Sequence, residues 1–168
     1  IEPHLNRGRQ ALILVPEIGL TPQMVSRFED RFCTRVTIIN SSLTDKQRAQ
    51  AWIDAKEGQS GIILGTRSAI FTPLKNLGII IVDEEHDLSY KQQEGFRYSA
   101  RDLAIYRSHS ERIPIILGSA TPSLESLFNA KRGKYKKLSL ASRPTESHPE
   151  TYKVIDTSQF STREGITH

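Results

Sequence analysis

Five short apolar runs recur along the chain, each separated from the next by a polar stretch with helical features. The runs are rich in Ile, Val and Leu and show no alternation of apolar and polar positions. This pattern is typical of strands that are buried on both faces of a parallel sheet. The predicted strands are Ala11–Val15, Arg35–Ile39, Gly61–Leu64, Ile79–Val82 and Ile113–Leu117.

The stretches between these runs carry helix start and stop signals. Each opens on a Ser or Thr that can accept a hydrogen bond from the free N–H groups of a first turn. Pro22 and Pro122 follow two of these caps, at the first helical position that proline favours. Strands that alternate with such helices predict an α/β domain with an open parallel sheet and helices on both faces. The expected helices are Thr21–Phe32, Asp45–Glu57 (capped by Thr44 and ended by Gly58), Ser99–Ser108, and Thr121 to near Gly133.

The two ends of the chain depart from this alternation. Ile1–Asn6 has the pattern of the last turns of a helix, so we expect the chain to begin within an element. Tyr135–Leu140 is predicted to form a further strand, and Tyr152–Ile155 is strand-like within a polar segment. We therefore expect one domain over residues 1–140, followed by an edge strand and a poorly ordered tail over residues 141–168.

Length and composition narrow the class of protein. A chain of 168 residues suits one domain with a single core. No apolar run approaches the ~20 residues of a membrane helix, and no secretory signal leads the chain. Cys33 is the single cysteine, which excludes a disulfide framework and a local zinc cluster and fits a reducing cytoplasm. The net charge of +4 and the pI of about 9.3 are compatible with a polyanionic partner.

The strongest chemical signal is the string from Ile79 to His86, in which an apolar strand ends in adjacent carboxylates. These carboxylates lie at the carboxyl edge of the predicted sheet, where α/β folds bind ligands. Asp83 can hold Mg²⁺, and Glu84 can orient and deprotonate a water that attacks a γ-phosphate. The same residues could instead form a solvated acidic turn, but the complete string with His86 favours phosphate chemistry.

Three further strings follow predicted strands. Gly118–Pro122 supplies small residues for close backbone approach and two hydroxyls that can bond the acidic residues, although Thr121 is also expected to cap a helix. Gly65–Ala69 offers amides, hydroxyls and a guanidinium to phosphates, and it also fits an ordinary surface turn. In Val15–Pro22, Thr21 and the free amides of a helix start can hold a backbone phosphate.

The segment Tyr90–Arg101 mixes aromatic residues with cations just after the acidic string. Aromatic faces stack on bases and cations track phosphates, which is how proteins bind single strands without sequence preference. A surface loop whose aromatics fold back into a local core would show the same composition. The residues concerned are Tyr90, Lys91, Phe96, Arg97, Tyr98 and Arg101.

The order of these strings, each at the carboxyl end of a strand, resembles the first RecA-like lobe of superfamily 2 helicases of the DEAH type. The longer strings are similar to those of the bacterial primosomal, replication-restart helicases. The resemblance extends from about Gly8 to Leu140, and it implies a three-layer RecA-like P-loop NTPase lobe. The strings are Val15–Pro22, Gly65–Pro73 (GTRSAIFTP), Val82–Asp87 (VDEEHD), Tyr90–Ala104 (YKQQEGFRYSARDLA) and Ile115–Pro122 (IILGSATP).

The resemblance also implies roles for individual residues. Asp83 would coordinate Mg²⁺ through water, and Glu84 would be the catalytic base. His86, Ser119 and Thr121 would couple the nucleotide site to the DNA side. The residues expected to contact DNA are Thr21, Thr66, Arg67, Tyr90, Lys91, Phe96, Arg97, Tyr98 and Arg101.

The function implied by the resemblance is that of an ATP-dependent 3′→5′ DNA helicase in a bacterial, nucleoid-associated protein. Such a helicase remodels stalled replication forks and initiates primosome assembly. ATP and Mg²⁺ would be its cofactors, with zinc bound elsewhere in the parent protein. Expected partners are single-stranded and forked DNA, primosome proteins and single-strand-binding protein, and no membrane is expected.

No P-loop string, Gly-x-x-x-x-Gly-Lys-Ser/Thr, occurs among the 168 residues. We therefore expect a truncated lobe of a longer protein that lacks its P-loop and second lobe. Alone, it is expected to have no ATPase or unwinding activity. A truncated sheet would also expose an apolar flank, through which the chain is expected to dimerise.

Two alternatives remain open. One is another superfamily 2 DNA translocase, RecG-like or RecQ-like, against which Gly65–Pro73 and the Tyr90–Arg101 segment argue. The other is a non-catalytic module that only binds DNA or a protein. The intact pair of Asp83 and Glu84 argues against the second alternative.

Overall fold

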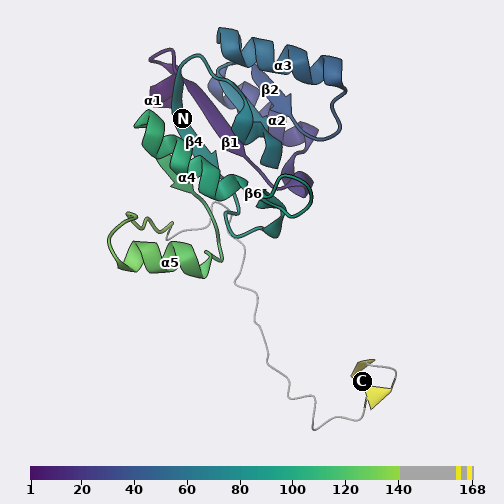
Figure 1. Ribbon diagram of the computed structural model, residues 1–168, viewed down its shortest axis with the longest axis vertical. Coiled ribbons are helices and arrows are strands. Elements are labelled where there is room, and N and C mark those ends of the chain that lie inside the picture. The colour runs from purple at the N-terminus through teal and green to yellow at the C-terminus, as the bar shows by residue number, and fades with distance from the viewer. Residues whose placement is uncertain (141–161, 164–165, 168) are drawn as a thin grey trace. The chain divides into compact units, whose positions relative to one another are not determined.

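The computed structural model describes residues 1–140, 162–163 and 166–167. Residues Ile1–Tyr135 form one compact unit built around a five-stranded parallel sheet (Figure 1). The strands lie in the order β2-β3-β1-β4-β7, and the five apolar runs predicted as strands are confirmed, with ends shifted by up to two residues. Their bounds are β1 (Gln10–Leu14), β2 (Val36–Ile39), β3 (Ile62–Gly65), β4 (Leu77–Val82) and β7 (Ile115–Leu117).

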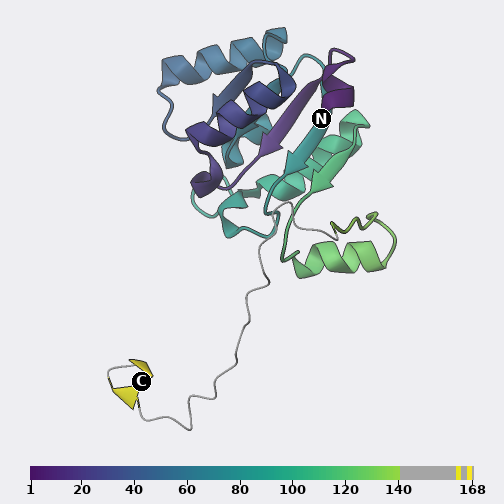
Figure 2. The same ribbon diagram turned by 180° about the vertical axis from the view of Figure 1, so that it is seen from behind.

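Helices cover both faces of the sheet, as predicted. One apolar cluster joins the sheet to helices α3 (Asp45–Glu57) and α4 (Ala100–Glu111), which lie in front of the strands in Figure 1. A second cluster joins the other face to α1 (Glu2–Leu5) and α2 (Pro22–Phe32), seen from that side in Figure 2. The resulting layers of helix, sheet and helix are those of an α/β domain.

Three of the four expected helix caps are confirmed. The hydroxyl of Thr21 accepts a hydrogen bond from the N–H of Met24 at 3.2 Å, and Ser99 caps α4 in the same way. Thr44 forms a reciprocal capping box with Gln47 at the start of α3. These caps depend on residues within one turn of each other, so the local sequence is sufficient to predict them.

The fourth predicted cap is wrong. Helix α5 spans Leu124–Lys131, and its cap is Ser123, whose hydroxyl accepts from the N–H of Ser126 at 3.3 Å. Thr121 lies before the helix, with its hydroxyl turned toward His86. The reason is a distant contact, because the N–H of Ser123 is held by the carboxylate of Glu85 at 2.7 Å.

The predicted strand over Tyr135–Leu140 is also wrong, since these residues form no regular element. Lys134, Lys136 and Lys137 interrupt the apolar pattern, so the segment lacks the continuous run that a buried parallel strand needs. The strand expected at Tyr152–Ile155 lies outside the described residues. Further along, β8 (Thr162–Arg163) and β9 (Ile166–Thr167) form a separate antiparallel pair.

Short elements follow the carboxyl ends of the strands. The 3-10 helix η1 (Glu17–Gly19) follows β1, and η2 (Arg67–Phe71) follows β3. Gly65 permits the second connection, because a Cβ atom there would clash with the carbonyl oxygen of Ile39 and with Ala69. After β4 come η3 (Leu88–Tyr90) and a two-stranded hairpin of β5 (Lys91–Gln92) and β6 (Tyr98–Ser99).

Within the described part of the chain, every helix is too short or too polar to cross a bilayer.

Candidate functional site

The residues Asp83–His86, here called the acidic box, directly follow β4 and lie between two other strand ends. The N–H of Asp83 donates to the carbonyl of Leu14 at the end of β1, at 2.9 Å. The N–H of Glu85 donates to the carbonyl of Gly118 after β7, also at 2.9 Å. The sheet therefore fixes the backbone of the box from both sides, at the edge where α/β folds bind ligands.

Glu84 holds an unusual backbone conformation within the box. Its φ of 44° lies in the left-handed region, which non-glycine residues rarely adopt. Its N–H donates to Oδ1 of Asp83 at 3.1 Å, and its side chain is half-exposed. Strained residues of this kind concentrate at functional sites, where the surrounding structure holds them in place. Glu84 thus presents a carboxylate to solvent from a rigid turn.

Asp83 lies beside Glu84 and close to the loop that follows β7. A Cβ atom on Gly118 would lie 3.6 Å from Oδ1 of Asp83, an ordinary van der Waals separation. No three His, Cys, Asp or Glu side chains gather as a metal site anywhere in the described residues. A single carboxylate is compatible with Mg²⁺, which keeps several waters and takes other ligands from substrate phosphates.

His86 connects the box to the loop that follows β7. Its Nδ1 lies 2.7 Å from the hydroxyl of Ser119, and its Nε2 lies 3.4 Å from the hydroxyl of Thr121. The carboxylate of Glu84 approaches the same Nδ1 at 3.6 Å. The structure therefore brings together the three residues predicted to couple the two sides of the site, next to the predicted base.

Glu85 is a functional candidate that sequence reasoning missed. Its side chain is only 1% exposed and accepts three hydrogen bonds. The N–H of Ser123 donates at 2.7 Å, its hydroxyl at 3.0 Å, and a guanidinium nitrogen of Arg101 at 3.2 Å. The sequence shows a third acidic residue in the box but does not show which of the three is buried. This cluster joins the acidic box, α4 and the start of α5.

The charge state of Glu85 follows from these contacts. Burial alone would raise the pKa of its carboxyl group, because a low-dielectric interior disfavours the charged form. The hydrogen bonds from Ser123 and Arg101 act in the opposite direction and prevail, so the pKa lies below its usual value of 4.5. Glu85 is therefore an anion at neutral pH and forms a buried ion pair with Arg101.

The segment with aromatics and cations forms the hairpin β5–β6 and its turn. Phe96 is 76% exposed near the turn, and Lys91 and Arg97 are also exposed. A groove of about 550 Å³ runs along the hairpin. It is lined by Lys91, Gln92, Gln93, Arg97, Tyr98 and Ser99.

Two residues of that segment point into the protein instead of toward solvent. Tyr90 belongs to the core, and its hydroxyl donates to the carbonyl of Asp83 at 2.6 Å. Burial and the nearby acidic carboxylates raise the pKa of this phenol. Arg101 is turned toward Glu85. In this structure, Tyr90 and Arg101 support the acidic box and are not placed beside Phe96 and Arg97.

Thr66 and Arg67 lie at the base of the hairpin. Thr66 is buried, while a guanidinium nitrogen of Arg67 donates to the carbonyls of Ser89 and Lys91 at 3.1 and 3.2 Å. Arg67 therefore ties η2 to the start of the hairpin. Its remaining nitrogens leave it able to contact a phosphate as well.

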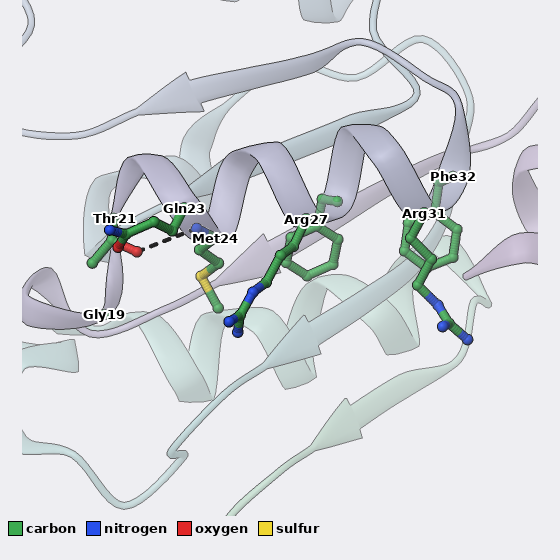
Figure 3. A pocket seen from close by; sticks show the side chains of 8 residues that line it. Gly19, Thr21, Gln23, Met24, Arg27, Arg31 and Phe32 are labelled. Carbon is green, nitrogen blue, oxygen red and sulfur yellow. Dashed lines mark hydrogen bonds between the residues drawn. The ribbon is translucent and has the colours of Figure 1, made fainter. Parts of the chain in front are cut away.

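Thr21 lies at one end of a surface groove along α2, shown in Figure 3. Arg27 and Arg31 project from one side of the helix at i, i+4 spacing, toward the same groove as Met24. Sequence reasoning assigned no role to these two arginines, although their helical spacing is visible in the sequence. The groove has a volume of about 740 Å³ and is lined by Gly19, Thr21, Gln23, Met24, Arg27, Phe28, Arg31 and Phe32.

Solved structures share this fold. The C-terminal domain of a Dbp5 variant from S. cerevisiae, bound to a Gle1 variant and IP6, aligns with a TM-score of 0.54 at 14% identity. The alignment covers 79% of this chain and 76% of that one. RecG bound to a three-way DNA junction aligns with a TM-score of 0.50 at 24% identity, over 75% of this chain and 16% of RecG. These likenesses confirm the predicted RecA-like α/β fold.

Sequence relatives are more specific. The chain is 51% identical over 166 residues to replication restart protein PriA of Haemophilus influenzae, covering 99% of this chain and 23% of that protein. It is 48% identical over 156 residues to PriA of Bacillus subtilis, covering 93% and 19%. The chain thus spans about a fifth of the length of these relatives. The resemblance to replication-restart helicases is confirmed. Because residues 1–129 of its 168 match the family model, the chain belongs to the DEAD/DEAH box helicase family.

Proposed function

We propose that this chain is part of an ATP-dependent, 3′→5′ DNA helicase that remodels stalled replication forks and initiates primosome assembly. The proposal rests on two sets of contacts that the side chains and backbone of the acidic box make with neighbouring segments. His86 joins the box to Ser119 and Thr121, while Tyr90 and Arg101 join it to the aromatic hairpin. The proposed site for hydrolysis and the proposed surface for nucleic acid are thereby connected through side-chain contacts. Relatives named replication restart protein PriA, at 40–51% identity, support this function.

On the nucleotide side, Glu84 is the proposed base. Its half-exposed carboxylate orients a water molecule toward a γ-phosphate and takes a proton from it. Asp83 is the proposed anchor for Mg²⁺ through water, and the bound ion would neutralise negative charge on the phosphates. Because the 168 residues contain no P-loop string, we propose that the chain alone does not turn over ATP.

On the DNA side, the exposed face of the hairpin is the proposed contact surface for a single strand. Phe96 and Tyr98 offer rings to bases, while Lys91 and Arg97 lie beside the groove where phosphates can pass. Thr21, Thr66 and Arg67 remain proposed contacts with the DNA backbone. For Arg67 this role is in addition to holding the hairpin, while Thr66 is buried and its N–H already donates to the carbonyl of Ile39 at 3.0 Å.

This DNA surface can be tested by the salt dependence of binding. Replacing Lys91 with Gln removes one charge beside the groove while keeping the chain length. For a phosphate contact with a single strand, the slope of log affinity against log salt should fall by about 0.7. The measurement is fluorescence anisotropy of a labelled oligothymidylate over a range of salt concentrations. Exposed Lys46 of α3 gives the matched control, and equal effects of Lys91→Gln and Lys46→Gln would refute a specific surface.

Interactions with stalled forks, primosome proteins and single-strand-binding protein belong to the same proposal. So do nucleoid association and a zinc module outside these 168 residues. They rest on the similarity to the named relatives.

We also propose that the isolated chain self-associates through β7. Among the described strands, β7 pairs with β4 alone, and Ile116 on it is 46% exposed. An apolar strand with a free edge is a template for pairing with a second chain. Sedimentation velocity should show a dimer that Ile116→Lys converts to a monomer. Ile53 of α3 is 47% exposed, so Ile53→Lys is the matched control, and a dimer that survives Ile116→Lys contradicts the proposal.

A further inference from the structure

The exposed aromatic surface does not end with the hairpin. Phe71, the last residue of η2, is 45% exposed and packs edge-on against Tyr98, with ring centroids 4.9 Å apart at 69°. Tyr98 also lies near Phe96, with ring centroids 5.9 Å apart and an angle of 33° between the rings. Two segments that are distant in sequence thus form one row of three rings.

The support beneath Phe71 is rigid. Its neighbour Ile70 is buried, and a guanidinium nitrogen of Arg107 donates to the carbonyls of Ile70 and Thr72 at 2.8 and 3.0 Å. Arg67, at the other end of η2, holds the hairpin backbone. A ring that is fixed in this way loses little conformational freedom when it binds a ligand.

The charges around the row point to a polyanion. Lys91 and Arg97 line the groove that Tyr98 also lines, and no acidic side chain is among its lining residues. Aromatic rings beside a cationic groove fit unpaired bases and their phosphates. A protein segment would instead need carboxylates on its own surface to match this groove.

We propose that Phe71 is a second stacking position for single-stranded DNA. One unpaired base stacks on the exposed ring of Phe96 and another on that of Phe71, and Tyr98, which is close to both rings, connects the two positions. This inference rests on the proposed function of the hairpin and extends its surface to η2. The ligand is therefore a strand that crosses from the hairpin to η2.

The test compares Phe71→Ala, Phe71→Trp and Phe96→Ala in the 168-residue chain, with oligothymidylate as the probe. Phe71→Ala should weaken binding about fivefold or more, and Phe71→Trp should retain it. With an abasic oligonucleotide of equal length, Phe71→Ala should cause no loss, since no base remains to stack. Tyr106 is an exposed aromatic on α4 outside the row, so Tyr106→Ala is the matched control. Photo-crosslinking of the unaltered chain to 5-iodouracil oligonucleotides should give a crosslinked peptide that contains Phe71.

The possible outcomes separate this inference from the proposed function. If Phe96→Ala weakens binding while Phe71→Ala does not and no crosslink maps to Phe71, the second stacking position is refuted and the hairpin surface stands. If Phe71→Ala weakens the abasic probe equally, its effect is structural and the inference is wrong. If the unaltered chain fails to bind single strands at all, both the inference and the proposed DNA surface fall.

Discussion

Glu84→Gln is expected to lower DNA-stimulated ATP turnover by ~10²–10⁴-fold, the contribution typical of a general base. The amide keeps the size and shape of the side chain and one acceptor oxygen, but it cannot take a proton from the attacking water. Nucleotide affinity should therefore change little. The measurement is steady-state phosphate release with and without single-stranded DNA. It is made on a full-length replication-restart protein that carries this segment.

Two controls make this result interpretable. Glu57→Gln changes an exposed acid at the end of α3, outside the hairpin, and should leave turnover near normal. The isolated 168-residue chain should release no phosphate, because it contains no P-loop string. Unchanged turnover in Glu84→Gln would show that the acidic box is structural, and the base would have to be sought elsewhere.

Arg101→Ala is expected to lower the free energy of unfolding of the chain by about 3 kcal/mol, as when one partner of a buried ion pair is removed. Glu85 is 1% exposed, so its charge would lose its cation without gaining water. Arg97→Ala, four residues earlier on the exposed hairpin, should cost less than about 0.5 kcal/mol, as surface changes do. Urea denaturation followed by circular dichroism gives both values. Equal costs for Arg101→Ala and Arg97→Ala would contradict the buried pair.

The same cluster predicts a pH dependence that identifies Glu85. Because the pKa of Glu85 is lower in the folded state, its contacts contribute stability above its ordinary value of 4.5. That contribution is lost as the pH falls below 4.5 toward the folded-state pKa. Glu85→Gln cannot titrate, so its stability should change less than that of the unaltered chain over this acidic range. A parallel pH profile for the two proteins would assign the acid sensitivity to other carboxylates.

Much of the fold could be predicted because its signals are local. A buried parallel strand is a continuous apolar run, and a cap such as Thr44 bonds a residue within one turn. The start of α5 could not be predicted in this way. The choice of Ser123 over Thr121 depends on Glu85, which is 38 residues away in the sequence.

The orientation of the aromatic and basic residues could not be predicted from the local sequence either. The segment from Tyr90 to Arg101 forms strands of two residues each, too short for a periodic pattern to reveal which side faces inward. Tyr90 and Phe96 are both aromatic, yet one lies in the core and the other in solvent. Contacts with residues outside the hairpin decide which side chains are buried. The carbonyl of Asp83 accepts a hydrogen bond from the hydroxyl of Tyr90, and the carboxylate of Glu85 accepts one from Arg101. The composition of the segment could not show which of its residues face solvent.

The hairpin is fixed at both of its ends and free at its tip. Arg67 holds the backbone where the hairpin begins, and Arg101 is anchored just after it ends. The hairpin can therefore act as a short lever whose base is held in place by these contacts. A bound strand that displaces Phe96 also moves the rest of the hairpin. The movement then reaches η2 through Arg67 and the acidic box through Arg101. In the proposed helicase, the stiffness of this short arm, more than the chemistry of its tip, would decide how much of a movement of bound DNA reaches the acidic box.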